Sequence, residues 1–393
     1  MTASIQPWHD AQQAQSLEWF RTLHAMPETG FTEHRTAAYV ASVLHGLGLE
    51  VIEGLGGTGL VGLLRGARAD QAAPFVGLRA ELDALPMTGP ADGTVQTTEG
   101  PRYHGCGHDG HMATLLTAAA FLAAQPDLPV NVAFIFQPAE ELLTGAAAMI
   151  EAGLLRLVPM SAIYALHNIP GLAAGSVGVA EGAALASSDE IRVTVTAQGT
   201  HGSAPHTGQD AILAAAHFLG LCQQLLTRRT DSRDSAVLSF GQIEGGHAPN
   251  VLPDTVRIAG SLRSHSEKAR AEVHGLLRAA GESTRLAFGT PVALEITAKV
   301  PVLMNDPRCA AIVRDAVIRT LGADRLIANP RAVMASEDFA LFRQHLPGAY
   351  IFVGQDGAYC HHPDYRFDPG IIPVGAAILV ELVRSAAGQP SIG

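Results

Sequence analysis

The densest group of reactive side chains in this sequence is the stretch YHGCGHDGHM, residues 103–112. It places Cys106, His108, Asp109 and His111 among three glycines. Thiolate and imidazole are favoured ligands of zinc and related divalent metals. Flanking glycines let the backbone come close to a bound group. In an extended loop, the one-residue spacing of CGH lets Cys106 and His108 point the same way. The stretch therefore indicates a metal site.

Further metal-binding and acid–base side chains stand where predicted strands end. They are, in chain order, Asp83, Glu140, Glu141, His167, Cys360, His361 and His362. Each has an ordinary structural explanation; a glutamate pair at a helix start, for example, complements the helix dipole. In open α/β sheets, however, ligands bind outside the carboxyl ends of the strands. The presence of such side chains after several predicted strands therefore predicts one shared ligand site.

The adjacent carboxylates of Glu140 and Glu141 cannot point the same way in an extended turn. One can therefore bind metal while the other faces water as a general base. This is the arrangement of a general base beside a Lewis-acidic metal.

The elements that must position these groups form a layered domain. Apolar runs that are almost uninterrupted predict buried strands, and these alternate with helical patterns. The strands are expected at 60–66, 75–82, 130–138 and 162–168, and the helices at 10–25, 32–47, 112–125 and 142–155. We expect an α/β fold with a mainly parallel sheet and helices on both faces.

The pattern changes near residue 186. Strands and helices over 191–300 follow the order β-α-β-β-α-β, which is typical of a ferredoxin-like α+β domain. After residue 300 the α/β pattern returns, with strands expected near 331–335 and 349–354. We therefore predict a small two-layer domain, 186–299, inserted into a larger α/β domain made of 1–185 and 300–393.

Composition restricts the partners. The chain has 393 residues, 47% of them hydrophobic, and a net charge of −11 without a basic run, which argues against nucleic acid or anionic membrane as a partner. The N-terminal twenty residues lack the basic head and apolar block of a secretory signal. The best apolar run, 112–125, is too short and too polar to span a membrane. We expect a cytoplasmic protein.

The sequence resembles the M20 peptidase family in its amidohydrolase branch, which includes hippurate hydrolases, N-acyl-amino-acid amidohydrolases and auxin-conjugate hydrolases. The resemblance implies a metal-binding catalytic domain, 1–185 and 300–393, with an inserted lid or dimerisation domain, 186–299. It runs nearly end to end, with the motifs in the family's order. They are LHAMPETGFTEHRTA (23–37), LRAELDALP (78–86), HGCGHDGHM (104–112), FQPAEE (136–141), LHN (166–168), GTHGSAPH (199–206), APNVLPD (248–254), SEDF (336–339) and HHP (361–363).

The resemblance implies a centre of two divalent ions, with zinc, manganese, cobalt or nickel all suited to the ligands. The implied ligands are Cys106, His108, Glu141, His167 and His362. Between the two adjacent histidines we favour His362, which directly precedes Pro363, and leave His361 as an outer hydrogen-bond partner. Asp83 and Asp109 are implied to orient the ligands.

The family pattern also implies roles in catalysis and substrate binding. Glu140 matches the general base, and His201 matches a histidine that stabilises the tetrahedral intermediate, in some relatives inside the partner subunit's site. Asn250 and Arg263 match positions that hold the substrate carboxylate, although Arg263 could also be a surface cation. Glu337 either lines the pocket or supplies negative charge near a helix start.

We therefore expect a metal-dependent amidohydrolase that cleaves N-acyl amino acids into a carboxylic acid and a free amino acid. The expected partner is this small substrate, and a homodimer or homotetramer is expected. The alternatives are a dipeptidase or aminoacyl peptidase of the same family, an enzyme acting on an N-acetylated intermediate such as acetyl-diaminopimelate, and a non-catalytic conjugate-binding protein. The last has no need of Glu140.

Overall fold

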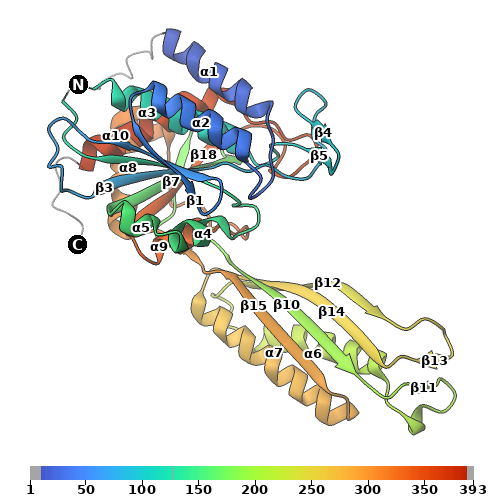
Figure 1. Cartoon of the computed structure of the whole chain (residues 1–393). Coiled ribbons are helices and arrows are strands. Elements are labelled where there is room, and N and C mark those ends of the chain that lie inside the picture. The colour runs from blue at the N-terminus through green and yellow to red at the C-terminus, as the bar shows by residue number, and fades with distance from the viewer. Residues whose placement is uncertain (1–9, 126, 387–393) are drawn as a thin grey trace. The chain divides into compact units, whose positions relative to one another are not determined.

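The computed structural model describes residues 10–125 and 127–386, which form two compact units (Figure 1). Unit 1 comprises Met1–Ala184, Met304–Arg331 and Asp338–Gly393, and unit 2 comprises Leu185–Leu303 and Ala332–Glu337. The segment 332–337, placed by the sequence pattern in the catalytic domain, thus clusters with unit 2. The first nine residues of the N-terminal stretch tested for a signal lie outside the described residues.

Unit 1 is built on an eight-stranded sheet in the order β1-β2-β6-β3-β7-β18-β8-β17. The strands are β1 (Glu50–Leu55), β2 (Gly59–Leu64), β3 (Phe75–Glu81), β6 (Val132–Gln137), β7 (Met160–Pro170), β8 (Val177–Val179), β17 (Leu326–Ala328) and β18 (Gly348–Gln355). The pairs β3–β6, β3–β7, β7–β18 and β8–β17 are parallel, so the predicted mainly parallel sheet is confirmed. The strands β3, β6 and β18 are buried along their whole length, as expected for a sheet covered on both faces.

Helices cover both faces of this sheet (Figure 1). They are α1 (Asp10–His24), α2 (His34–Gly46), α3 (His108–Ala123), α4 (Gly145–Glu151), α5 (Leu154–Leu157), α8 (Pro307–Leu321), α9 (Phe339–Arg343) and α10 (Ile372–Ala386). On one face α3 and α10 pack together, with α1 against α3 and α8 against α10. On the other face lie α4, α5 and α9. The predicted strand near 331–335 is wrong: the strand in this region is β17, which is followed by the left-handed Asn329 (φ 53°) and Pro330, and within 331–335 Val333 makes an isolated bridge with Leu185.

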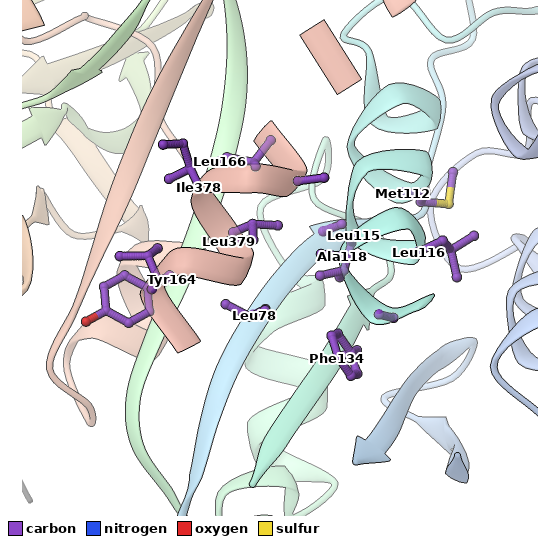
Figure 2. Close-up of a cluster of buried hydrophobic side chains, with 14 of the residues drawn as sticks. Leu78, Met112, Leu115, Leu116, Ala118, Phe134, Tyr164, Leu166, Ile378 and Leu379 are labelled. Carbon is purple, nitrogen blue, oxygen red and sulfur yellow. The ribbon is translucent and has the colours of Figure 1, made fainter. Parts of the chain in front are cut away.

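The core between α3, α10 and the sheet is apolar (Figure 2). Met112, Leu115 and Leu116 on α3 are buried on several sides of the helix, and Phe134 on β6 is fully buried. A helix that is apolar all round must be a core element. The packing of α3 in this core holds its first turn, which carries predicted metal ligands, in a fixed position.

Phe134→Ala is expected to lower the free energy of unfolding by about 3–5 kcal/mol, because it removes a buried ring and leaves a cavity. Urea denaturation would measure the change. Leu157→Ala is the control, since Leu157 is 50% exposed and its truncation should change stability by less than about 0.5 kcal/mol. Equal losses in both variants would contradict this assignment of the core.

α3 begins at His108, four residues before the predicted start at 112. Gly107, with φ 93°, adopts the left-handed conformation that precedes the first turn. His108, Asp109 and His111 are therefore helical residues, which corrects the expectation of a loop. A helix fixes their directions much more firmly than a loop would.

Among the described residues, one segment, Pro369–Ala386, meets the length and hydropathy criteria of a membrane span, with a mean hydropathy of 1.5. This differs from the prediction, which gave 112–125 as the best apolar run. It contains α10, whose Ile378 and Leu379 are buried against the rest of unit 1 (Figure 2). Buried core helices meet the same criteria, so the segment is weak evidence for a membrane.

Unit 2 has the predicted ferredoxin-like order. Its main elements are β10 (Ser187–Thr196), α6 (Ala211–Arg229), β12 (Ala236–Gly245), β14 (Thr255–Ser264), α7 (Glu267–Phe288) and β15 (Val292–Val300). The antiparallel sheet has the order β12-β14-β10-β15, and α6 and α7 bury Phe218 and Leu277 beside Val193 of β10. β11 (Thr200–His201), which follows β10, pairs antiparallel with β13 (Val251–Leu252), which precedes β14.

Shorter strands complete the description: β4 (Val95–Thr97), β5 (Gly100–Arg102), β9 (Ala183–Leu185) and β16 (Leu303–Met304).

Candidate metal centre

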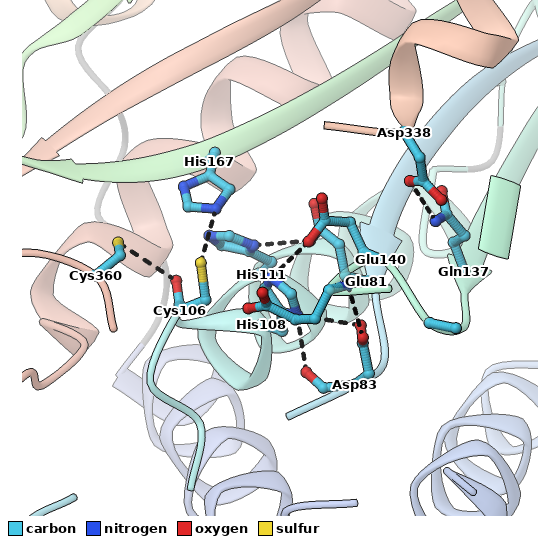
Figure 3. Close-up of polar contacts among 12 residues, drawn as sticks. Glu81, Asp83, Cys106, His108, His111, Gln137, Glu140, His167, Asp338 and Cys360 are labelled. Carbon is cyan, nitrogen blue, oxygen red and sulfur yellow. Dashed lines mark hydrogen bonds and ion pairs between the residues drawn. The ribbon is translucent and has the colours of Figure 1, made fainter. Parts of the chain in front are cut away.

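Three separate segments of unit 1 meet at the carboxyl end of the sheet (Figure 3). Cys106 immediately precedes Gly107 and α3, and His108 is the first residue of α3. His167 lies within β7, and its Nε2 is 3.4 Å from Cys106 Sγ. Glu140 and Glu141 follow β6. The structure thus brings together these side chains, which the sequence analysis expected at the ends of strands.

The potential ligand atoms fall into overlapping groups in which every pair of atoms lies within 4.8 Å. One group is Cys106, His108 and His167, and another is Cys106, Glu141 and His361. A donor common to both groups is what a two-ion centre with a bridging ligand requires. Cys106 is the residue shared by these two groups.

His108 provides a test of whether these residues fit a divalent ion. Its Nδ1 donates to the carbonyl oxygen of Asp83 at 2.8 Å, while its buried Nε2 has no hydrogen-bond partner among the described residues. Burial lowers the pKa of His108, but the hydrogen bond to Asp83 and the nearby carboxylates raise it to about 10. The pocket thus attracts positive charge at an unpaired imidazole nitrogen, which a divalent ion can supply.

The other two donors also suit an ion. Burial, and then the neighbouring His111, lower the pKa of His167 to about 3, so its imidazole is neutral, as ligation requires. A hydrogen bond with Cys360, burial and the charge of Glu141 hold the pKa of Cys106 well above its usual range. A divalent ion would take the place of the thiol proton.

The two carboxylates separate as the turn demands. Glu140, which is buried, has Oε2 3.8 Å from His108 Nε2. Glu141 has Oε1 3.2 Å from His361 Nε2, and its backbone N–H donates to Asp83 Oδ2 at 2.9 Å. Asp83 therefore braces both His108 and the backbone of Glu141.

The structure brings His361, and not the favoured His362, close to the other candidate ligands. His361 adopts a left-handed conformation (φ 67°) that brings its ring to Glu141 and Cys106. His362 instead has Nδ1 3.8 Å from Asp364 Oδ2 and belongs to none of the ligand groups found among the described residues. The sequence rule that favoured the histidine next to Pro363 could not detect this change of backbone direction.

Comparison with known proteins agrees with this geometry. Residues 77–385 match the model of Peptidase family M20/M25/M40. The chain belongs to the M20 peptidase family. It is 34% identical to the hippurate hydrolase of Campylobacter jejuni over 92% of this chain and 93% of that protein. It is 33% identical to the N-acetyl-L-cysteine deacetylase of Bacillus subtilis, covering 93% and 86% of the two chains.

A solved Bacillus subtilis structure, named a dinuclear metal binding peptidase from the M20 family, matches with a TM-score of 0.83 and 27% identity. The match covers 97% of this chain and all of that one. The chain is thus a metal-dependent amidohydrolase of the M20 family, and its cofactor is a pair of divalent ions.

Not every residue expected near this M20 centre touches a ligand. The carboxylate of Asp109 is buried and pairs with His24 Nδ1 at 2.6 Å, and its other oxygen accepts the N–H of Gly110. Asp109 therefore ties α1 to α3, and any influence on the ligands passes through the position of α3.

The pair of His24 and Asp109 predicts a pH-dependent contribution to stability. Burial lowers the pKa of His24, but the hydrogen bond with Asp109 and the charge of Asp109 raise it above 6.5. Burial raises the pKa of Asp109, but the charge of His104 and the hydrogen bond with His24 lower it below 3.8. The pair should stabilise most between about pH 4 and 6.5. Its contribution declines as pH rises through the folded-state pKa of His24, and as pH falls through that of Asp109.

His24→Gln should therefore lower Tm most near pH 5.5 and less near pH 9. A hydrogen bond between charged groups contributes roughly 1.5–3 kcal/mol. His45→Gln, on the exposed side of α2, is the control, because exposed ion pairs contribute little. A Tm difference for His24→Gln that is constant with pH would contradict a charged pair.

A buried polar network beside the M20 centre escaped the sequence reasoning. Arg79 is fully buried and contacts Glu81, Gln137 (2.8 Å) and Asp338 (3.2 Å). Glu81 in turn holds His111 Nδ1 at 2.8 Å. The signal was available, since two charged residues two positions apart inside an apolar strand need partners at the strand's end.

The residues of unit 2 with predicted roles lie at two opposite ends of its sheet. His201, in β11, and Asn250, directly before β13, are exposed at the end of the sheet where β11 pairs with β13 (Figure 1). Arg263 lies near the other end of β14, where its guanidinium contacts Ser336 Oγ, and the buried Glu337 follows that serine. Eight extended residues of β14 separate the ends by roughly 25 Å. Asn250 and Arg263 of one chain therefore cannot hold the same carboxylate.

Proposed function

We propose that this M20 amidohydrolase hydrolyses the amide bond of N-acyl amino acids and releases a carboxylic acid and a free amino acid. The observation that carries the proposal is Glu140, a buried carboxylate whose Oε2 lies 3.8 Å from Nε2 of the candidate ligand His108. A protein that only bound conjugates would need the ligands but no additional base. The relatives named as hippurate hydrolase and N-acetyl-L-cysteine deacetylase support this substrate class.

In this proposal, the ions are held by one cysteine, three histidines and one carboxylate. These residues are Cys106, His108, Glu141, His167 and His361. When bound, the ions supply Lewis acidity, which polarises a carbonyl and brings the pKa of water near neutrality. Glu140 accepts a proton from the attacking water and delivers it to the leaving amine. Asp83 keeps His108 and Glu141 in place.

Unit 2 supplies the remaining groups in the proposal. His201 stabilises the oxyanion, and Asn250, Arg263 and Glu337 line the substrate site. Asn250 and Arg263 are far apart in one chain. A homo-oligomer in which the β11–β13 strand pair of a partner subunit enters the site would satisfy both roles. The proposal therefore includes a dimer or tetramer, with unit 2 as a lid or dimerisation domain. A cytoplasmic location is a separate part of the proposal.

The test is hydrolysis of a panel of substrates by protein reconstituted with metal, beside the chelated form. The panel holds benzoyl, acetyl and indoleacetyl amino acids, acetyl-diaminopimelate and unmodified dipeptides. Metal-dependent cleavage of an acyl conjugate is the expected result. Cleavage of dipeptides alone would make the protein a peptidase. No cleavage by metal-loaded protein would contradict the proposal and favour a binding protein.

A further inference from the structure

The loop that carries Glu140 and Glu141, residues 138–145, has an unusual backbone. Ala139 (φ 51°) and Leu143 (φ 56°) are both left-handed, although neither is glycine. Side chains other than glycine, asparagine and aspartate rarely adopt this conformation, and it persists only where the surroundings impose it. Ala139 directly precedes Glu140, so its conformation sets the direction in which the carboxylate of Glu140 leaves the backbone.

Three buried carboxylates accept backbone N–H groups in or next to this loop. Glu33 Oε1 accepts from Ala139 at 2.8 Å, Asp83 Oδ2 from Glu141 at 2.9 Å and Asp338 Oδ2 from Ala146 at 2.9 Å. The side chains of Asp83 and Asp338 are also used elsewhere, by His108 and by Arg79 with Gln137. Glu33 is the carboxylate whose bond is made to the left-handed residue itself.

Glu33 reaches the loop from the distant motif 23–37, to which sequence analysis assigned no role. It is fully buried, and its second oxygen accepts the hydroxyl hydrogen of Thr58 at 2.6 Å. A buried carboxylate is costly unless it is hydrogen-bonded. Here both oxygens are engaged, and one of them holds the residue before the base.

We propose that Glu33 is a positioning residue for catalysis, holding Ala139 in its left-handed conformation and thereby aiming Glu140. Glu33 acts through the backbone and touches neither substrate nor ions. The inference rests on the proposed role of Glu140 as general base. It gives Glu33, one residue of the N-terminal motif, a part in positioning the base.

The principal test compares Glu33→Met, which removes the acceptor while keeping most of the volume, with Glu33→Gln. We expect Glu33→Met to lower kcat by about 10- to 100-fold, the effect of a small displacement of a catalytic group. KM and the metal content should change little, because Asp83 still holds Glu141. Glu33→Gln should keep most of kcat, since its amide oxygen can accept from Ala139 and its amide nitrogen can donate to Thr58.

A second substitution separates positioning from general destabilisation. Ala139→Gly, added to Glu33→Met, should recover most of kcat, because glycine adopts a positive φ without the steric cost paid by alanine. Recovery of Tm without kcat, or no recovery, would overturn the proposal. Glu28→Gln is the matched control: this carboxylate on the same motif accepts from Thr36 N–H and hydroxyl groups and should leave kcat unchanged.

Amide hydrogen exchange provides a readout that needs no substrate. Exchange in a peptide covering residues 138–143 should be faster in Glu33→Met than in the unmodified metal-loaded protein, with no change over the core of α3. Equal exchange in both would overturn the proposal. If the unmodified protein cleaves no acyl amino acid, the proposed function fails, and this measurement still decides whether Glu33 holds the loop.

If Glu33→Met does not fold, Thr58→Val gives the same test in weaker form. It removes the hydroxyl that holds the second oxygen of Glu33. We expect kcat to fall several-fold and Ala139→Gly to restore it. An unchanged kcat together with unchanged exchange over 138–143 would contradict the proposal.

Discussion

Glu140→Gln is expected to lower kcat by roughly 100- to 10,000-fold, the usual contribution of a positioned general acid or base. Glutamine keeps the shape of the side chain but cannot accept the proton of the attacking water. Because Glu140 is not assigned to the ions, the metal content should stay at the level of the unmodified protein. Turnover of the best acyl amino acid, together with elemental analysis of the purified variant, would measure both quantities.

Glu141→Gln is the matched comparison, one residue along the same loop. Glu141 lies in a ligand group with Cys106 and His361, so its substitution should reduce bound metal as well as turnover. The opposite pattern, with metal lost from Glu140→Gln and retained in Glu141→Gln, would show that the two carboxylates exchange roles. Full activity of Glu140→Gln would remove the general-base mechanism altogether.

His361→Ala is the second substitution for which we expect a large effect. It removes the imidazole that approaches Glu141 and Cys106, and with it a ligand of one proposed ion. Loss of even an outer partner of a metal site costs about 10- to 100-fold in affinity or activity, so loss of a ligand should cost at least that much. Titration of the metal-free variant with the metal, with bound metal and kcat measured at each step, would show the loss of affinity and of activity.

His362→Ala provides a control that differs by a single position. Its ring is 55% exposed and faces Asp364, so metal content and kcat should remain within about twofold of the unmodified protein, as expected of a surface substitution. Metal loss in His362→Ala but not in His361→Ala would restore the choice made from the sequence. Loss in both would mean that the segment as a whole, not one ring, maintains the site.

The reaction class could be predicted from the sequence because its signals are local. Apolar runs at 75–82 and 130–138 predicted buried parallel strands, and parallel strands bring their carboxyl ends to the same edge of a sheet. Asp83, Glu140 and Glu141 follow those runs directly, so their meeting at the metal centre required no knowledge of distant contacts. The ordered motifs indicated the M20 family for the same reason.

Other features were decided by the backbone. The left-handed residues at 107 and 361 determine that α3 starts at His108 and that His361, not His362, approaches Glu141. A positive φ at a histidine depends on packing around the turn and leaves no periodic trace in the sequence. Residue type and spacing alone could not choose between two adjacent histidines.

By itself, the sequence determined the layered fold, the inserted ferredoxin-like order and the residue types of the metal centre, because these follow from hydrophobic pattern and short-range spacing. Only the tertiary structure decided the long-range partners. It joined Glu33 to Ala139 across 106 residues, buried Arg79 against Asp338, and placed Asn250, just before β13, far from Arg263, near the end of β14. Such contacts depend on how whole elements pack, and packing is a property of the folded chain.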